Sequence, residues 1–332
     1  MKKIKNVIID SDMGWDDVLS ICYLMKNPSI NILAITVTGC GETDLKWGSI
    51  IAKTLMELGE QVDAKVSIGA DKPLKFNHKF PQSFKNDMND IMGLMGSLNP
   101  KNTIEFDKRD AWDLLYDSLE NCSEKITILS LGGFTNIAKM LEKYPTAKIE
   151  NIEQIYAMAG AVYVDGNVAL LNNAKKQWNQ GAIYSTNYSA EWNVFVDPVA
   201  TKKVFDSTIP ITLIPLDACN YVVLNAQYVD TITTIDPIAT LVKNIFIQKT
   251  GSHDEGIPVP IFDPLATMIM AGDLQYYQFH EQYLDVNTSD TEVNNHCGKT
   301  YITPKGKRKI TIVQGVSQLE FSIQFAKIIN KG

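Results

Sequence analysis

The sequence predicts an α/β protein with an open, mostly parallel central sheet and helices on both faces. Short apolar runs alternate with amphipathic segments of helical period through the first half of the chain and beyond its middle. Such alternation is typical of parallel sheets, because each helical crossover returns the chain to the same edge of the sheet. The expected strands are 7–9, 32–37, 66–68, 126–131, 155–158 and 211–214.

Helices are expected between these strands. Residues 45–58 place Ile51 and Leu55 on one face, which predicts an amphipathic helix. Near the C-terminus, short alternating runs over 280–313 predict a small β-hairpin region or edge strands, and 316–329 predict a closing helix. The other expected helices begin near Val18 or span about 111–120, 135–143 and 197–205.

Two long connections interrupt this pattern. Residues 71–107 contain many polar residues, Met and Gly, and we expect them to form a mobile flap. Residues 163–192 form a second connection that is too long to be a simple turn. No linker, repeat or low-complexity tract divides the chain, so we expect a single domain over residues 1–332.

The composition is that of an ordinary globular protein, with 332 residues of which 45% are hydrophobic and 21% are charged. The net charge of −7 argues against a nucleic-acid partner, and no apolar run is long enough to cross a membrane. The chain begins Met-Lys-Lys-Ile-Lys, which leaves no room for a signal-peptide core before the first strand. The five cysteines lack any paired spacing, so we expect reduced thiols in a cytoplasmic protein, without a zinc site.

Four aspartates lie within eight residues between the first expected strand and the first expected helix: Asp10, Asp12, Asp16 and Asp17. This position is the carboxyl edge of the sheet, where α/β folds bind their ligands. Two carboxylates about 5 Å apart repel by about 3 kcal/mol at an effective dielectric of about 20, so four together favour a bound cation. Oxygen ligands predict a hard divalent ion, calcium or magnesium. The alternative is helix capping, which explains one or two of the four residues.

Glycines and polar residues follow the other strands at the same edge. Singly, such residues indicate only tight turns. In order after the aspartates, they form a specific pattern over 38–41, 131–136, 158–160, 166–167, 190–193 and 262–266. This ordered pattern resembles the nucleoside hydrolase family, which includes the inosine-uridine preferring enzymes. Its most specific element is Asp-x-Asp-x-Gly-x-Asp-Asp at residues 10–17.

The resemblance implies a nucleoside hydrolase-like fold and calcium-dependent hydrolysis of the N-glycosidic bond of ribonucleosides, giving ribose and a free base. It also implies a homodimer or homotetramer. Asp12, Asp17, the backbone carbonyl of Thr135 and the carboxylate of Asp263 would bind Ca²⁺. Asp12 would also accept the proton of the attacking water. Because bond breaking builds positive charge on the ribose, a cage of carboxylates and amide oxygens would favour the transition state.

The same resemblance implies that Asp16 binds the ribose hydroxyls and that Asp10 holds the acidic loop from behind. The other residues implied at the ribose are Asn167, Glu191, Asn193 and, packing beneath the sugar, Met158. Each has a structural alternative. Asn167 follows a glycine and could belong to a turn, Met158 could be a core residue, and Asp263 before proline is a common helix start.

The chain departs from the family pattern at two positions. Cys40 stands in the substrate-binding set where most relatives have asparagine, and it could equally be a small buried apolar residue. Phe262 stands where purine-active relatives often have a histidine that protonates the departing base. We therefore hypothesise that aromatic side chains stack on the base and make it easier to protonate from solvent. The candidates for a base pocket are Trp15, Trp192 and Phe262.

The segment 168–190 reads as an insertion between two ribose-binding blocks. We expect it to border the pocket and narrow substrate choice, with an oligomer contact as the competing role. Its aromatic and basic residues are Lys175, Lys176, Trp178, Tyr184 and Tyr188. Two histidines, His78 and His253, lie in expected loops, where a lone histidine is more often solvated than catalytic.

Two other functions are compatible with parts of the pattern. Haloacid-dehalogenase-type phosphatases also begin with strand-Asp-x-Asp, but they need a later Gly-Asp-x-x-x-Asp pair. Here Gly272-Asp273 is followed at that spacing by Tyr277. The second alternative is a catalytically impaired nucleoside-binding protein, because the family's histidine and asparagine are missing. Retention of the calcium ligands and of Asp12 favours hydrolysis.

Overall fold

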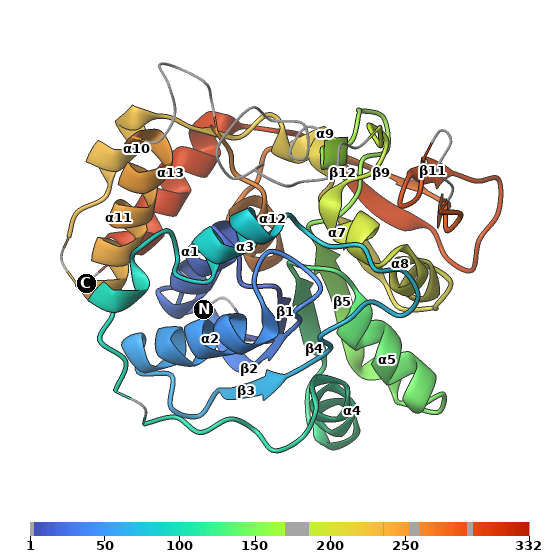
Figure 1. Cartoon of the computed structure of the whole chain (residues 1–332), viewed down its shortest axis with the longest axis horizontal. Coiled ribbons are helices and arrows are strands. Elements are labelled where there is room, and N and C mark those ends of the chain that lie inside the picture. The colour runs from blue at the N-terminus through green and yellow to red at the C-terminus, as the bar shows by residue number, and fades with distance from the viewer. Residues whose placement is uncertain are drawn as a thin grey trace.

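An eight-stranded sheet runs through the protein (Figure 1), in the order β3-β2-β1-β4-β5-β6-β12-β9. This computed structural model describes residues 3–101, 103–169, 186–234, 236–251, 259–290 and 295–331. All neighbouring strands pair in parallel except β9, which is antiparallel to β12 at one edge. The strands are β1 (Lys5–Ser11), β2 (Ile30–Val37), β3 (Lys65–Ile68), β4 (Ile126–Ser130), β5 (Ile152–Ala157), β6 (Ile211–Leu213), β9 (Tyr277–Gln282) and β12 (Ile310–Val316).

Helices cover both faces of this sheet, as the sequence predicts. Successive side chains of β1 point to opposite faces, and Val7 and Ile9 enter one hydrophobic cluster while Ile8 enters another. The first cluster contains residues of α1 (Trp15–Met25), α2 (Leu45–Leu58), α11 (Pro237–Gly251), α12 (Asp263–Ala271) and α13 (Gln318–Ile329). The second contains residues of α4 (Ala111–Asn121), α5 (Thr135–Lys143) and α8 (Pro198–Phe205). Figure 1 shows α4 and α5 on the opposite side from α11 and α13.

Shorter elements connect the layers. They are α3 (Gln82–Met88), α7 (Trp192–Val196), α9 (Leu216–Cys219), α10 (Ala226–Thr231), the 3₁₀ turns Met95–Ser97 and Ile149–Asn151, and two small antiparallel pairs, β7 (Val223–Leu224) with β8 (Val259–Pro260) and β10 (Leu284–Val286) with β11 (Thr300–Ile302). In the described part of the chain, no helix combines the length and apolar character needed to span a membrane.

The six strands expected from apolar runs are confirmed, and so is the hairpin region near the C-terminus. The sequence did not indicate that β12 lies inside the main sheet, between β6 and β9. It also did not indicate α10 or α11, and it indicated only the start of α12, as the structural alternative for Asp263 before proline. All nine residues of α12 are buried, so the helix carries no polar stripe to reveal its period. Because β12 joins the strands of the first half in one sheet, we propose a single domain over residues 1–332.

The expected flap, residues 71–107, contacts the rest of the protein at several points. Its C-terminal part is fixed by Glu57 of α2, whose carboxylate accepts the backbone N–H groups of Lys101, Thr103 and Ile104 (2.9, 2.5 and 3.0 Å). Farther forward, Lys85 of α3 donates to the carbonyl of Gly39 (3.1 Å). The segment is thus attached to the loop that follows β2, close to the sheet edge that holds the aspartates.

In the second long connection, residues 170–185 lie outside the described residues, and with them Lys175, Lys176, Trp178 and Tyr184. The expectation that this insertion borders the pocket therefore stays a prediction. Its two ends are described, and Tyr188 is exposed. His253 likewise lies outside the described residues.

Candidate active site

The carboxyl ends of four neighbouring strands meet at one edge of the sheet. Backbone hydrogen bonds continue just beyond the strands, from Thr38 N–H to Ser11 O (2.9 Å), Leu131 N–H to Asp10 O (2.8 Å) and Met158 N–H to Ser130 O (3.0 Å). The loops that follow β1, β2, β4 and β5 therefore lie side by side at the carboxyl edge of the sheet. The acidic loop after β1 lies between the loops after β2 and β4, which contain glycine and polar residues.

The loop between β1 and α1 turns sharply at Met13, which adopts a left-handed conformation with φ of 60°. Such a conformation is costly for a bulky side chain and is found preferentially at functional sites. Ser11 stabilises the turn, because its hydroxyl accepts the Met13 N–H (3.0 Å) and donates to Asp17 (2.5 Å). The other oxygen of Asp17 accepts the Gly14 N–H (2.9 Å). The turn thus aims the first residues of α1 back at the sheet edge.

A third carboxylate reaches this loop from far along the chain. Asp263 is the first residue of α12, and its N–H donates to Asp16 (3.4 Å). The carboxylate oxygens of Asp16, Asp17 and Asp263 lie within 4.8 Å of one another, and all three residues are buried. The resemblance implies Asp12, Asp17 and Asp263 as the carboxylate ligands of the ion, whereas the cluster found here contains Asp16 in place of Asp12.

Burial and mutual repulsion disfavour the charged forms of these groups. Burial, followed by the charges of neighbouring carboxylates, raises the pKa of Asp17 and of Asp263 well above the usual range. Burial also raises the pKa of Asp12 to about 6. A divalent cation among these oxygens would remove the penalty, since it supplies the positive charge that buried carboxylates need. The donor set contains only oxygen, which fits a hard divalent ion.

Asp12 lies against the loop after β2. One carboxylate oxygen accepts the Glu42 N–H (3.0 Å), and the Asp12 carbonyl accepts the Thr43 hydroxyl (2.6 Å). Gly41 makes this contact possible, because a Cβ at that position would overlap the Asp12 carboxylate. Asp12 is therefore held by backbone and hydroxyl donors, and it also interacts with the Asp17 carboxyl.

The opposite wall of the site is polar and equally well ordered. Glu191 precedes α7, and its carboxylate accepts N–H groups from Asn193 and Gly160 (both 2.8 Å), while burial raises its pKa to about 7. The Asn193 amide donates to the carbonyls of Leu131 (3.1 Å) and Met158 (2.9 Å). These contacts join the loops after β4 and β5 to α7.

One cavity joins the two walls. Its lining residues are Asp12, Asp16, Asp17, Glu42, Phe80, Leu131, Met158, Asn167, Glu191, Trp192, Asn193, Phe262 and Asp263. Carboxylates and amides therefore share one small space with aromatic rings. The cavity thus combines carboxylates that could hold a cation, polar groups that could bind a sugar, and aromatic rings that could stack on a base.

The profile of the family described as "Inosine-uridine preferring nucleoside hydrolase" matches residues 7–322. The chain belongs to this family. Members of the family are N-ribosyl hydrolases that act on nucleosides.

Individual relatives agree with this assignment. The chain is 27% identical over 263 residues to the pyrimidine-specific ribonucleoside hydrolase RihA of Escherichia coli, which covers 78% of this chain and 76% of the relative. It is 31% identical over 212 residues to an uncharacterized protein of Schizosaccharomyces pombe, which covers 64% of this chain and 61% of that protein. A solved plant nucleoside hydrolase has a TM-score of 0.79 at 20% identity, covers 99% of both chains and shows the same fold.

Most residues expected at the site of a nucleoside hydrolase line the cavity, but four do not. Asp10 lies behind the loop and accepts hydrogen bonds from Thr36 (2.7 Å) and Asn136 (2.8 Å), as expected for a supporting residue. The other three are Cys40, whose thiol donates to the carbonyl of Ala70 (3.8 Å), Thr135, whose hydroxyl donates to Asp197 (2.8 Å), and Trp15, whose ring lies under the Lys249 ammonium (4.3 Å).

Three lining residues were not among the predicted site residues: Leu131, which lies in the expected pattern after β4, Glu42 and Phe80. Glu42 adds a sixth carboxylate to the cavity, and its Oε2 atom is buried without a hydrogen-bond partner among the described residues. Its place in the loop after the second strand was a usable signal. Phe80 belongs to the flap and stacks on Trp192 with ring centroids 4.0 Å apart. Nothing in the local sequence marks Phe80, because its role depends on how the flap folds back.

The buried carboxyl of Asp10 gives a test of the electrostatics. Burial raises its pKa from 3.8 to about 7, so between these values the unfolded chain has lost the proton while the folded chain keeps it. Stability must therefore fall as pH rises through this window. Asp10→Asn keeps the oxygen that accepts from Thr36 and Asn136 but cannot ionise. The loss of unfolding free energy between these pH values should therefore be smaller in the variant, by up to about 4 kcal/mol. Urea unfolding between about pH 4 and pH 7, with a chelator present, measures it; parallel profiles for the two proteins would contradict it.

Proposed function

We propose that the protein is a calcium-dependent ribonucleoside hydrolase that releases ribose and a free base. The observation that supports it most directly is that Asp16, Asp17 and Asp263 form a buried oxygen cluster in the same cavity as Glu191 and Asn193. The first three groups suit a hard cation, and the last two suit the hydroxyls of a sugar. Family membership supports the reaction class.

As the family resemblance implies, Asp12, Asp17 and Asp263 would hold the ion, together with the backbone carbonyl of Thr135. Asp16, the other member of the carboxylate cluster, would lie beside the ion and bind the ribose hydroxyls. When bound, Ca²⁺ supplies Lewis acidity that makes a water molecule easier to deprotonate. Asp12 accepts the proton of that water. A carboxylate placed beside the water is a suitable general base. The water oxygen then forms a bond to the anomeric carbon as the bond to the base breaks.

Ribose recognition is assigned to Asp16, Asn167, Glu191 and Asn193, with Met158 packing beneath the ring. These side chains would accept and donate hydrogen bonds to the sugar hydroxyls, and their oxygens stabilise the positive charge that develops on the ribose. A 2′-deoxy substrate leaves some of these buried groups unpaired, which costs about 1–3 kcal/mol for each group. Ribonucleosides should therefore be strongly preferred.

The base would occupy the aromatic side of the cavity. Phe80, Trp192 and Phe262 line it, and none of the described lining residues is a histidine. The buried indole N–H of Trp192 has no hydrogen-bond partner in the described part of the chain, so it is available to a base or sugar acceptor. We propose that stacking on these rings eases protonation of the departing base. Trp15, away from the cavity, has no part in this.

The cavity has a volume of about 40 Å³, which is too small for a nucleoside, so we propose that Phe80 of the flap moves when the substrate enters. Protonation from solvent is compatible with such a movement. The alternative of a phosphatase finds no support, because Asp273 accepts hydrogen bonds from Tyr23 (2.7 Å) and Asn27 (2.6 Å), away from the cavity. We further propose a homodimer or homotetramer, by analogy with the family, and a cytoplasmic location, which five cysteines without disulfides support.

Ribose release from a panel of ribonucleosides tests the proposed activity. With Ca²⁺, at least one purine or pyrimidine ribonucleoside should be cleaved and its 2′-deoxy analogue cleaved poorly. Asp12→Asn should lower kcat by roughly 10²–10⁴, because it removes the general base. The exposed Asp206→Asn is the matched control and should leave the rate unchanged. Tight binding of a nucleoside without release of ribose would instead show a binding protein.

Calorimetry of Ca²⁺ binding tests the metal assignment without an activity assay. The chelated protein should bind Ca²⁺ more tightly than Mg²⁺, because a cluster of carboxylates and carbonyls suits the larger ion. Asp263→Asn should weaken Ca²⁺ binding by on the order of tenfold or more and reduce the rise in melting temperature that the ion causes. Equal Ca²⁺ affinity in wild type, Asp263→Asn and Asp206→Asn would remove Asp263 from the site.

The aromatic hypothesis predicts a separate effect on the base. Trp192→Ala and Phe80→Ala should each lower kcat/KM by about tenfold, since stacking on a base contributes about 1–3 kcal/mol. Trp192→Phe should retain most of the activity if stacking dominates and lose it if the indole N–H does. Trp15→Phe, outside the cavity, is the control. Unchanged turnover of every base by all the variants would reject stacking as the activating interaction.

A further inference from the structure

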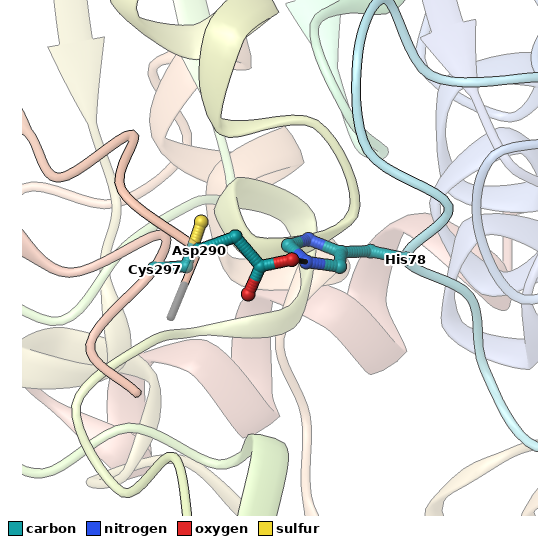
Figure 2. A group of neighbouring side chains, drawn as sticks. All are labelled: His78, Asp290 and Cys297. Carbon is teal, nitrogen blue, oxygen red and sulfur yellow. Dashed lines mark hydrogen bonds and ion pairs between the residues drawn. The ribbon is translucent and has the colours of Figure 1, made fainter. Parts of the chain in front are cut away.

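Three potential metal ligands converge outside the acidic site. His78 belongs to the flap, whereas Asp290 and Cys297 belong to the connection between β10 and β11. Their ligand atoms lie within 4.8 Å of one another, and the Nε2 atom of His78 is 3.1 Å from Oδ2 of Asp290. Figure 2 shows the Asp290 carboxylate directed at the imidazole ring of His78. Two segments more than two hundred residues apart in the sequence meet here.

The hydrogen bonding of His78 determines which nitrogen can bind a cation. Its Nδ1 atom lies 2.6 Å from the carbonyl oxygen of Phe195, which can only accept, so Nδ1 carries the hydrogen. In the neutral ring, Nε2 then presents a lone pair to an acceptor of Asp290. Such a contact is stable only with a positive charge between or on the two groups. An N–H to carbonyl contact on the far nitrogen is also the usual support of a metal-binding histidine.

The surroundings hold these groups in place. The His78 ring is stacked between Phe76 and Phe195, with centroids 5.2 and 4.1 Å away. The backbone of Cys297 is fixed on both sides, because its N–H donates to Asn295 (2.9 Å) and its carbonyl accepts from Asn187 (2.8 Å). A ligand set that is ordered before binding loses little entropy on binding.

We propose that His78, Asp290 and Cys297 form a second metal site, which takes a borderline divalent cation of the Zn²⁺ class. Imidazole, carboxylate and thiolate are the ligands that Zn²⁺ prefers, and a water molecule would complete a four-coordinate shell. The all-oxygen acidic site suits a hard ion, so the two sites select different metals.

Binding at this site displaces the Cys297 proton to solvent. Burial raises the pKa of that thiol to about 12, so the thiolate forms only when a cation is present. The sequence predicted no zinc site, because the cysteines lack paired spacing. That criterion detects ligands close together in sequence, and this set is assembled by the fold.

Cobalt substitution tests the proposal on the folded, full-length protein. Metal is removed with a chelator, excess Ca²⁺ is added to saturate the acidic site, and Co²⁺ is titrated while absorption is recorded. One equivalent of Co²⁺ should give a thiolate-to-cobalt charge-transfer band that Zn²⁺ abolishes by competition. Cys297→Ser should remove the band, and Cys122→Ser, which changes a half-buried cysteine elsewhere, should keep it. No band in the wild type, or a band that survives Cys297→Ser, would overturn the proposal.

Thermal unfolding gives a second test, which remains valid if a variant is less stable because the Zn²⁺-induced shift is measured within each protein. Asp290 is 33% exposed, so Asp290→Asn should leave the fold intact. Zn²⁺ should raise the melting temperature of the wild type, and Asp290→Asn should require about tenfold more Zn²⁺ for the same shift. If His78 and Asp290 form only an ion pair, Zn²⁺ will leave the wild-type melting temperature unchanged. That result would also overturn the proposal.

Discussion

The functional edge of the sheet depends on carboxylates that are buried closer together than their charges favour. Asp17 illustrates the balance. It gains hydrogen bonds from Ser11 and Gly14, yet burial and its acidic neighbours still raise its pKa well above the usual range. The backbone contributes to the cost, since Met13 is held in a left-handed conformation. A fold that maintains such a loop is stabilised by a cation, which turns the repulsion among the oxygens into coordination.

Most residues that the sequence suggested for the site line one cavity, whereas some of the elements that carry them were not predicted. Asp263 was named from an ordered motif, and only the start of α12 was indicated there, because all residues of this helix are buried and show no amphipathic period. Cys40 was placed correctly in the loop after β2, but only the structure shows its thiol directed at Ala70. Phe80 could not be identified at all. Its contact with Trp192 requires the flap to fold back over the sheet edge, which no local pattern determines.

The flap is attached on both sides of the aromatic contact. On the N-terminal side of Phe80, the Leu74 N–H donates to Asp197 (2.8 Å). On its C-terminal side, the Lys85 ammonium donates to the carbonyl of Gly39 (3.1 Å). Asp197 also accepts the hydroxyl of Thr135, so this attachment reaches the start of α5 (2.8 Å). Between these two attachments, His78 is bonded to the Phe195 carbonyl (2.6 Å) and to Asp290 (3.1 Å). The movement of Phe80 that we propose for substrate entry would therefore change these contacts of His78 as well.

The same part of the flap contains His78, which connects the proposed metal site to the proposed movement of Phe80. The His78 ring stacks on Phe195, Phe195 contacts the edge of Trp192, and Trp192 stacks on Phe80. A cation that joined His78 to Asp290 and Cys297 would add a restraint on the flap between these two attachments. This restraint would limit the movement of these aromatic rings and would not change the positions of the acidic oxygens. A cation there would therefore reduce substrate entry into the cavity, and the affinity of the acidic cluster for its own ion would stay the same.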